Sequence, residues 1–195
     1  MSEYEKMISS QIYNANYDEE LWKMRIFASD LCQEFNKLGL SDIDEKLEII
    51  DKLKIKRKTR CTLETPFYCD YGFNISFGEN FYANRNLVLL DAGKIHFGDN
   101  VFIGPSCVFT TAGHPLDVDR RNEGLEYAYP INVGDNVWIG AGVTINPGVS
   151  IGENSVIGSS SVVTKDIPAN SLAFGNPCRV IRKITEDDKL TNYNK

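Results

Sequence analysis

A six-residue period runs through the C-terminal half of the sequence. In register, consecutive units open at Val133, Ile139, Ile145, Ile151, Ile157 and Val163 and read VGDNVW, IGAGVT, INPGVS, IGENSV, IGSSSV and VTKDIP. Every unit opens with Val or Ile, and Gly follows in four of the six units. A short strand and a tight bend use about six residues, so three units close a triangular coil on which the next coil stacks.

The same period is present upstream, in the units FGENFY from Phe77, ANRNLV from Ala83, FGDNVF from Phe97 and IGPSCV from Ile103. The register slips by two residues between Ile95 and Phe97, where we expect a small bulge or loop. Large apolar openers should point inward, while Gly and Asn suit corners that need a tight bend or a positive φ. The pattern predicts a mainly β chain wound as a parallel β-helix.

An antiparallel β-sandwich is the alternative for Val/Ile segments broken by Gly-rich turns. Its turns recur at intervals of about 8 to 12 residues without a constant opening residue. The unbroken sixfold register therefore favours the β-helix. Spacing alone does not give the handedness, because most parallel crossovers are right-handed.

The first part of the chain has a different composition. Residues 4–58 contain one glycine, Gly39, and no proline, and are rich in Glu, Lys, Leu and Ile. A helix is predicted from apolar residues at near-helical spacing, namely Leu21, Met24, Ile26, Phe27, Leu31 and Phe35. A second helix is predicted from Ser41, as N-cap, through Leu47, Ile50 and Leu53.

Charge and composition narrow the class of protein. The net charge of −6 argues against general binding of nucleic acid. No apolar run approaches the ~20 residues that span a bilayer, and the first ten residues do not resemble a signal peptide. The five cysteines form no C-x-x-C pair, which predicts reduced, packed thiols. We therefore expect a cytoplasmic protein that binds neither membranes nor nucleic acid.

The repeats and the stretch NFYANRNLVLLDAGKIHFGDNVFIGPSCVFTTAGHPLD closely resemble the maltose and galactoside O-acetyltransferases, with the nodulation acetyltransferase as a near relative. The resemblance extends from the N-terminal segment to the closing PCRVIRKI. It implies a left-handed β-helix, a homotrimer and acetyl-coenzyme A as the acetyl donor, with no metal. It divides the chain into a helical cap that closes over the substrate (1–60), the β-helix (61–185) and a tail (186–195).

Acetyl transfer to an alcohol needs a base, and histidine is suited to this role at neutral pH. The chain has two histidines. His114 lies where the sixfold rhythm breaks, and the rhythm resumes near Pro130, so residues 113–129 should form an extruded loop. His114 also matches the catalytic position of the family, whereas His96 lies within the repeat and is interpreted as a structural or surface residue. Glu126 of the same loop matches a family glutamate, and either orients His114 or forms a salt bridge at the rim.

The resemblance also implies the residues that bind the two substrates. Asp70, Tyr82, Asn84 and Asp91 should line the pocket for the sugar hydroxyl, although Asp70 and Asp91 could equally serve only as turn formers. One residue of the N-terminal segment should also contact the sugar, and the candidates are Asn16, Tyr17 and Asp18. Trp138 and Ala141 should border the thioester, with a backbone N–H near Ala141 facing the developing oxyanion. The resemblance implies that Ser159, Thr164 and Lys165 contact the rest of coenzyme A. Arg179 and Arg182 match positions near its phosphates.

The predicted activity is direct transfer of acetyl from acetyl-coenzyme A to a sugar hydroxyl, with His114 as general base and without an acyl-enzyme. The nearest alternative keeps the fold and donor but uses another acceptor, such as an antibiotic hydroxyl, a serine or an amine. A metal-dependent β-helix enzyme of the carbonic anhydrase type needs three histidines as metal ligands. With two histidines per chain, such a site forms only if a trimer combines His96 and His114 from different subunits. A non-catalytic scaffold would explain the repeats but not the histidine loop or the basic tail.

Overall fold

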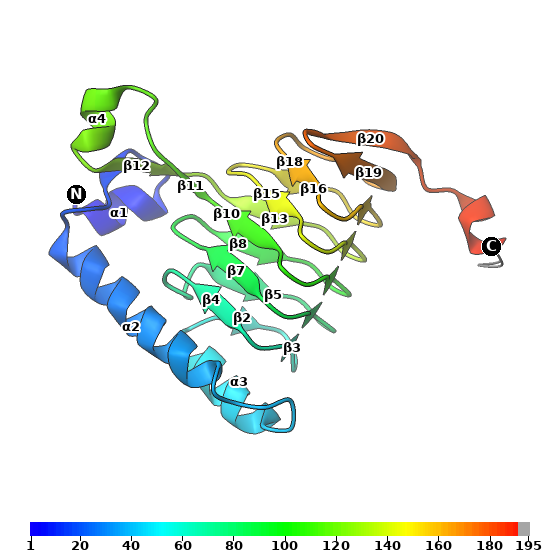
Figure 1. Cartoon of the computed structure of the whole chain (residues 1–195), viewed down its shortest axis with the longest axis horizontal. Coiled ribbons are helices and arrows are strands. Elements are labelled where there is room, and N and C mark those ends of the chain that lie inside the picture. The colour runs from blue at the N-terminus through cyan, green and yellow to red at the C-terminus, as the bar shows by residue number, and fades with distance from the viewer. Residues whose placement is uncertain (191–195) are drawn as a thin grey trace.

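The computed structural model describes residues 1–190 and contains three parallel sheets that form the sides of a prism (Figure 1). We name each sheet by one of its strands. The β7 sheet contains β4 (Phe67–Cys69), β7 (Leu87–Leu90), β10 (Val108–Thr110), β15 (Thr144–Ile145) and β18 (Val162–Val163). The β8 sheet contains β2 (Lys56–Arg57), β5 (Ile75–Phe77), β8 (Ile95–Phe97), β13 (Ile131–Val133) and β16 (Ser150–Ile151).

The third side, the β14 sheet, contains β3 (Thr62–Leu63), β6 (Tyr82–Ala83), β9 (Phe102–Ile103), β14 (Trp138–Ile139), β17 (Val156–Ile157), β19 (Ser171–Gly175) and β20 (Cys178–Lys183). Each coil visits the β8, β14 and β7 sheets in turn. Among the described strands of these three sheets, β20 alone runs antiparallel to its neighbour. The predicted parallel β-helix is confirmed. Its left-handed winding stays a prediction from the resemblance.

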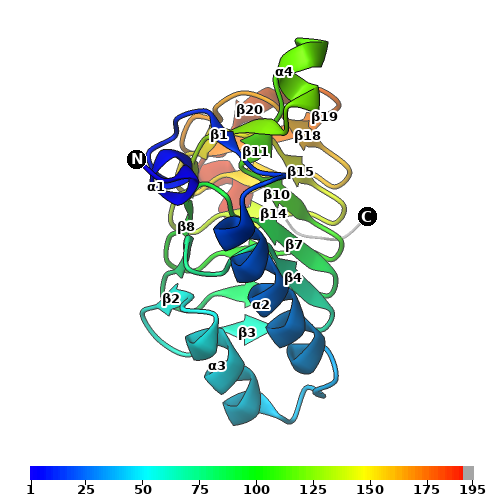
Figure 2. The same ribbon diagram turned by 90° about the vertical axis from the view of Figure 1, so that its left-hand side faces the viewer.

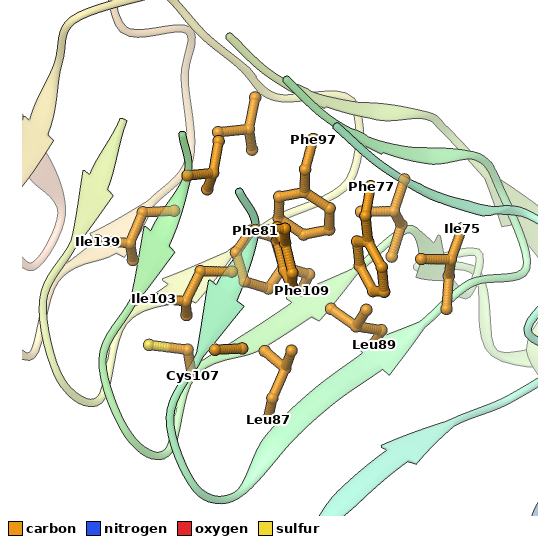
Figure 3. Packing of buried hydrophobic residues seen from close by; sticks show 14 of the residues in the cluster. Ile75, Phe77, Phe81, Leu87, Leu89, Phe97, Ile103, Cys107, Phe109 and Ile139 are labelled. Carbon is orange, nitrogen blue, oxygen red and sulfur yellow. The ribbon is translucent and has the colours of Figure 1, made fainter. Parts of the chain in front are cut away.

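The inward-facing openers of the repeat form the core of the prism. Val133, Ile139, Ile145, Ile151, Ile157 and Val163 are all buried. In the earlier coils, aromatic rings fill the interior (Figure 3): Phe77 stacks on Phe81 with ring centroids 4.0 Å apart, and Phe97 lies 5.0 Å from both Phe81 and Phe109. Burial of these side chains on every coil is what makes stacking favourable.

Asparagines at the corner between the β8 and β14 sheets form a ladder. Each Nδ2 donates to the Oδ1 of the next residue at 3.0–3.1 Å, through Asn80, Asn100, Asn136, Asn154 and Asn170. All five have a positive φ, between 53° and 58°, which asparagine tolerates better than most residues. The sequence pattern therefore reflects both a backbone requirement and a hydrogen-bond chain.

The predicted position of the register slip was wrong. Leu89 is in register with Ile145 and Phe97 with Ile151, so eight residues in the early coil correspond to six in the later one. Ile95 and Phe97 belong to one continuous strand and both point inward. The two extra residues therefore lie in the turn 91–94, because β8 pairs with β13 without interruption from Ile95 to Phe97.

Three helices form the N-terminal part: α1 (Glu3–Ile8), α2 (Glu19–Phe35) and α3 (Ile43–Lys52). α2 lies along the outside of the prism and packs against β4 and α3 (Figure 2). Its buried side chains are Leu21, Ala28, Leu31, Cys32 and Phe35. Ile26 and Phe27, which the spacing assigned to the apolar face, are exposed because they fall beside this stripe.

The second helix begins one residue later than predicted. Asp42, not Ser41, is its N-cap residue, although its carboxylate accepts the backbone N–H of Gly39 instead of capping the helix. The first parallel strand, β2, begins at Lys56, within the segment assigned to the cap. Leu47, Ile50 and Leu53 are buried as the spacing predicts.

The segment between β10 and β13 leaves the prism. It contains β11 (Ala112–Gly113), α4 (Val118–Asn122), which projects from the prism, and β12 (Leu125–Ala128) (Figure 1). β12 pairs with β11 and with β1 (Tyr13–Asn14), so the loop and the N-terminal segment form one small sheet. This arrangement holds the N-terminal segment beside the extruded loop.

The last described element is a short 3-10 helix, η1 (Glu186–Leu190), and residues 191–195 of the predicted tail lie outside the described residues. Within residues 1–190, no helix is both long and apolar enough to cross a bilayer. The five cysteines are buried free thiols, as the packing interpretation predicts.

Candidate active site

A polar pocket of about 300 Å³ lies where the β7 sheet turns toward the β8 sheet, beneath the extruded loop. The prism, the loop, α2 and the segment preceding it all contribute to its walls. Its lining residues are Ala15, Arg25, Asp70, Tyr71, Leu90, Thr110, Ala112, His114 and Glu126. Three of the predicted site residues, His114, Glu126 and Asp70, are therefore brought together in one chain.

His114 follows β11, and one of its ring nitrogens is occupied by the backbone. Nδ1 lies 2.9 Å from the carbonyl oxygen of Leu125 on the facing strand. A carbonyl can only accept, so in the neutral ring Nδ1 is the protonated nitrogen and Nε2 carries the lone pair. The side chain is 43% exposed, which leaves Nε2 accessible from the pocket. This is the tautomer that a general base requires at Nε2.

Glu126 lies on the opposite side of the imidazole from Leu125. Its Oε2 is 3.5 Å from Nε2, and its Oε1 accepts a hydrogen bond from the hydroxyl of Tyr13 on the paired strand β1. Burial raises the pKa of Glu126, and the Tyr13 hydrogen bond and His114 oppose this shift. The acceptor that fixes the tautomer is thus the Leu125 carbonyl and not Glu126, while Glu126 is placed to interact with an imidazolium.

Asp70 and Arg25 form the opposite wall of the pocket. Asp70 follows β4, and burial raises the pKa of its carboxyl, while the charge of Arg25 lowers it. Neither side chain makes a hydrogen bond to another residue in the described part of the chain, so both can bind a hydroxylated ligand.

Asp91 does not face the pocket, contrary to the prediction. It is completely buried, and its carboxylate accepts the backbone N–H groups of Tyr71 and Gly72 at 2.8 Å and of Asp70 at 3.1 Å. Burial raises the pKa of Asp91 to about 7, and the N–H groups of Tyr71 and Gly72 oppose the rise. Asp91 therefore holds the turn that carries Asp70, because its acceptor sites are already occupied by the backbone.

Tyr82 and Asn84 lie at a different corner from His114. They precede β7, at the corner between the β14 and β7 sheets, whereas the pocket lies beyond its end. A four-residue strand such as β7 spans about 13 Å. Tyr82 donates to Glu64 Oε1 at 2.6 Å. A single chain therefore does not bring Tyr82 or Asn84 to the His114 pocket.

The N-terminal residues flank the pocket. Asp18 is the N-cap of α2, and its Oδ1 accepts the backbone N–H of Leu21 at 2.8 Å. Asn16 is exposed beside Gly124 of the extruded loop. Asn16, Tyr17 and Asp18 line a shallow hollow rather than the pocket that contains His114. The use of Asp18 as a helix cap is a role that the sequence analysis did not assign.

The predicted cofactor residues occupy two corners and the end of the prism. Ala141 and Ser159 lie on successive coils at the corner that also carries Asn84, with Trp138 exposed on the adjoining strand β14. Thr164 and Lys165 follow β18, at the corner that carries the His114 pocket. Arg179 and Arg182 lie on β20, where Arg182 pairs with Asp188 at 2.6 Å.

Sequence reasoning missed three groups that determine the electrostatics around His114, besides the less polar lining residues of the pocket. Arg25 occupies an ordinary charged position on a helix, and Tyr13 reaches Glu126 only through the pairing of β1 with β12. The Leu125 carbonyl is a backbone group, so its residue type gives no signal. The one available clue was the position of Leu125 directly before Glu126.

Hexapeptide coils interrupted by a loop that holds an imidazole over a polar pocket define a hexapeptide-repeat acyltransferase. The maltose acetyltransferase hexapeptide capping motif matches residues 6–53, and the bacterial transferase hexapeptide (six repeats) matches residues 130–165. Within residues 1–190, no cluster of three or more His, Cys, Asp or Glu side chains is arranged to bind a metal ion.

A putative acetyltransferase of Saccharomyces cerevisiae is 53% identical over the full length of both chains. The crystal structure of a maltose O-acetyltransferase from Clostridium difficile 630 is 49% identical, with a TM-score of 0.91 over 95% of this chain and 99% of that one. A galactoside acetyltransferase in complex with coenzyme A is 41% identical, with a TM-score of 0.90 over 100% and 96%. This chain belongs to the maltose and galactoside O-acetyltransferase family, and it is an acetyltransferase.

Proposed function

We propose that this enzyme transfers acetyl from acetyl-coenzyme A to a hydroxyl of a sugar, with His114 as the general base. The observation that supports this most directly is the free Nε2 of His114 at a pocket whose other wall carries Asp70 and Arg25. Complexes of related enzymes with coenzyme A and with acetyl-coenzyme A support the donor. The names of the maltose and galactoside enzymes support a sugar as the acceptor.

In the proposed reaction, Nε2 of His114 accepts the proton of the sugar hydroxyl as its oxygen attacks the thioester carbonyl. The imidazolium is stabilised by the Leu125 carbonyl at Nδ1 and by the carboxylate of Glu126, 3.5 Å from Nε2. It then returns the proton to the departing thiolate, so the base is regenerated. Acetyl passes directly to the sugar without an acyl-enzyme.

The tetrahedral intermediate carries an oxyanion that needs a hydrogen-bond donor. The backbone N–H of Ala141 suits this role, since it donates to no acceptor within residues 1–190. Ala141 and the His114 pocket of the same chain lie at different corners of the prism, separated by the width of the β7 sheet. We therefore place the N–H of one subunit against the imidazole of another.

This division of groups between two corners supports a homotrimer. At the edge of the prism where the β7-sheet strands begin lie Asn84, Trp138 and Ala141, and at the edge where these strands end lies His114. A closed ring of three chains would pair one corner of each subunit with the other corner of its neighbour. Measurement of the solution mass by light scattering tests this arrangement, and an active monomer would contradict it.

The two histidines provide a matched test of the base. We expect His114→Ala to lower the rate of coenzyme A release by about 10²–10⁴-fold, which is the usual contribution of a general base. His96 is the control, because it is exposed on the β8 sheet, with its Nδ1 2.9 Å from Ser76 Oγ. A His114→Ala enzyme as active as His96→Ala would overturn the assignment.

The acceptor is tested with a panel of glucose, maltose, galactosides, hydroxylated antibiotics, serine and amines at saturating acetyl-coenzyme A. Transfer to a sugar with the highest kcat/KM supports the proposal. Faster transfer to serine, an amine or an antibiotic favours the alternative acceptor.

The buried free thiols support a reducing, cytoplasmic site of action.

A further inference from the structure

A second pocket adjoins the one that contains His114. It has a volume of about 340 Å³ and lies between α2 and β4. Asp70 and Arg25 line both pockets, so the second pocket continues from the first around these two side chains. The proposed function does not use the second pocket, although its position gives it access to a molecule bound near His114.

The outer wall of the second pocket is aromatic. Trp22 lies on α2 directly after the buried Leu21, and its side chain is 55% exposed. Tyr68, the outward-facing residue of β4, is 45% exposed and lines the same pocket. Contiguous apolar surface that is rimmed by polar groups and lines a concave site marks a binding surface, whereas a single exposed apolar residue does not.

The remaining lining is mixed, because Ile26 and the thiols of Cys32 and Cys69 add apolar surface beside several polar groups. Ser29 and Asp30 belong to the exposed face of α2, and the guanidinium of Arg25 lies 5.7 Å from the centroid of the Trp22 ring. The pocket therefore combines flat apolar rings with hydroxyl, carboxylate and guanidinium groups. A pyranose ring has the complementary surface, because its C–H face is apolar and its edge carries hydroxyl groups.

We propose that this second pocket, which we call the Trp22 subsite, binds a further sugar ring of the acceptor while His114 acts on the ring in the first pocket. The inference rests on the proposed function and adds a specificity: the enzyme prefers a disaccharide to the corresponding monosaccharide. Continuity of the two pockets through Asp70 and Arg25 supports a single ligand that spans both. Trp22 is an acceptor-binding residue and takes no part in proton transfer.

The first experiment measures kcat/KM for maltose and for glucose with Trp22→Ala, Trp22→Phe and the wild type. We expect Trp22→Ala to lower the maltose-to-glucose ratio by about threefold to tenfold, which corresponds to the usual energy of an aromatic contact. Trp22→Phe should retain most of the ratio. Phe27→Ala is the matched control, because Phe27 is 56% exposed on the same helix and lines neither pocket.

An unchanged maltose-to-glucose ratio of kcat/KM in Trp22→Ala, whether both sugars lose equally or neither loses, would overturn the Trp22 subsite. The proposed function would stay intact. Absence of transfer to any sugar by the wild-type enzyme would overturn the proposed function and the subsite with it. The two failures are therefore distinguishable.

A second experiment reads binding directly. The chain has two tryptophans, so Trp138→Phe leaves Trp22 as the only indole. We expect maltose to shift the Trp22 emission and protect it from acrylamide, and glucose to do so less at equal concentration. An indole that is already shielded without sugar indicates that another subunit covers it, and this result would overturn the subsite.

Discussion

Replacement of Glu126 by Gln tests whether a carboxylate charge beside His114 accelerates transfer. The substitution keeps an oxygen that can accept from Tyr13 but removes the charge 3.5 Å from Nε2. At this distance, unit charges attract by about 1 kcal/mol in water and about 5 kcal/mol at an effective dielectric constant of about 20. The imidazole is 43% exposed and the carboxylate 15%, so we expect an intermediate value and about a 100-fold loss of kcat.

The assay is release of coenzyme A followed with a thiol reagent at saturating acetyl-coenzyme A, where the buried cysteines give little background. Glu123→Gln is the control, because Glu123 is an exposed carboxylate of the same loop. The rate ratio of wild type to Glu126→Gln should be largest at neutral pH. It should decline as the pH falls through the pKa of Glu126, and this decline begins above the range of an ordinary glutamate because burial raises that pKa. A kcat within twofold of wild type at pH 7 would refute the electrostatic role.

Three further predictions concern the turn, the coils and the donor site. Asp91→Asn should lower the free energy of unfolding by about 1–3 kcal/mol, because an amide cannot accept all of the backbone N–H groups that the carboxylate accepts. Urea unfolding at fixed protein concentration measures this loss, and Asp119→Asn, at an exposed position, is the control. Gly152→Ala should cost a similar amount by the same measurement, since its Cβ would lie 2.3 Å from a backbone nitrogen of the next coil, whereas Gly39→Ala should change stability by less than about 0.5 kcal/mol. Arg182→Ala should raise the KM for acetyl-coenzyme A by about tenfold with little change in kcat, and an unchanged KM would remove Arg182 from the donor site.

The architecture was predictable because a β-helix is determined locally. Each coil contacts mainly its neighbours, so a short repeated pattern of inward Val or Ile and corner Gly or Asn specifies the whole stack. Positions such as Ile139 and Asn136 therefore indicate their burial and corner geometry directly. The slip was detected for the same reason, but its location required the pairing of β8 with β13.

The helical part was less predictable, because an amphipathic pattern does not state which neighbour a helix meets. Ile26 and Phe27 belong to an apolar pattern in the sequence, yet the orientation of α2 on β4 leaves both exposed. The same orientation places Trp22 and Arg25 at the pockets. Only the packing of the helix against the prism decides this.

The sequence by itself predicted the β-helix, because the repeat is local, and it singled out His114 as the candidate base, because a histidine at the point where a strict repeat breaks is distinctive. Tertiary structure alone decided the chemistry around that histidine. The Leu125 carbonyl at Nδ1, the Tyr13 hydroxyl on Glu126 and the burial of Asp91 all depend on segments that are distant in sequence or on backbone groups. Hydrogen bonds of this kind are set by distance and direction in space, and residue spacing along a chain does not determine either quantity.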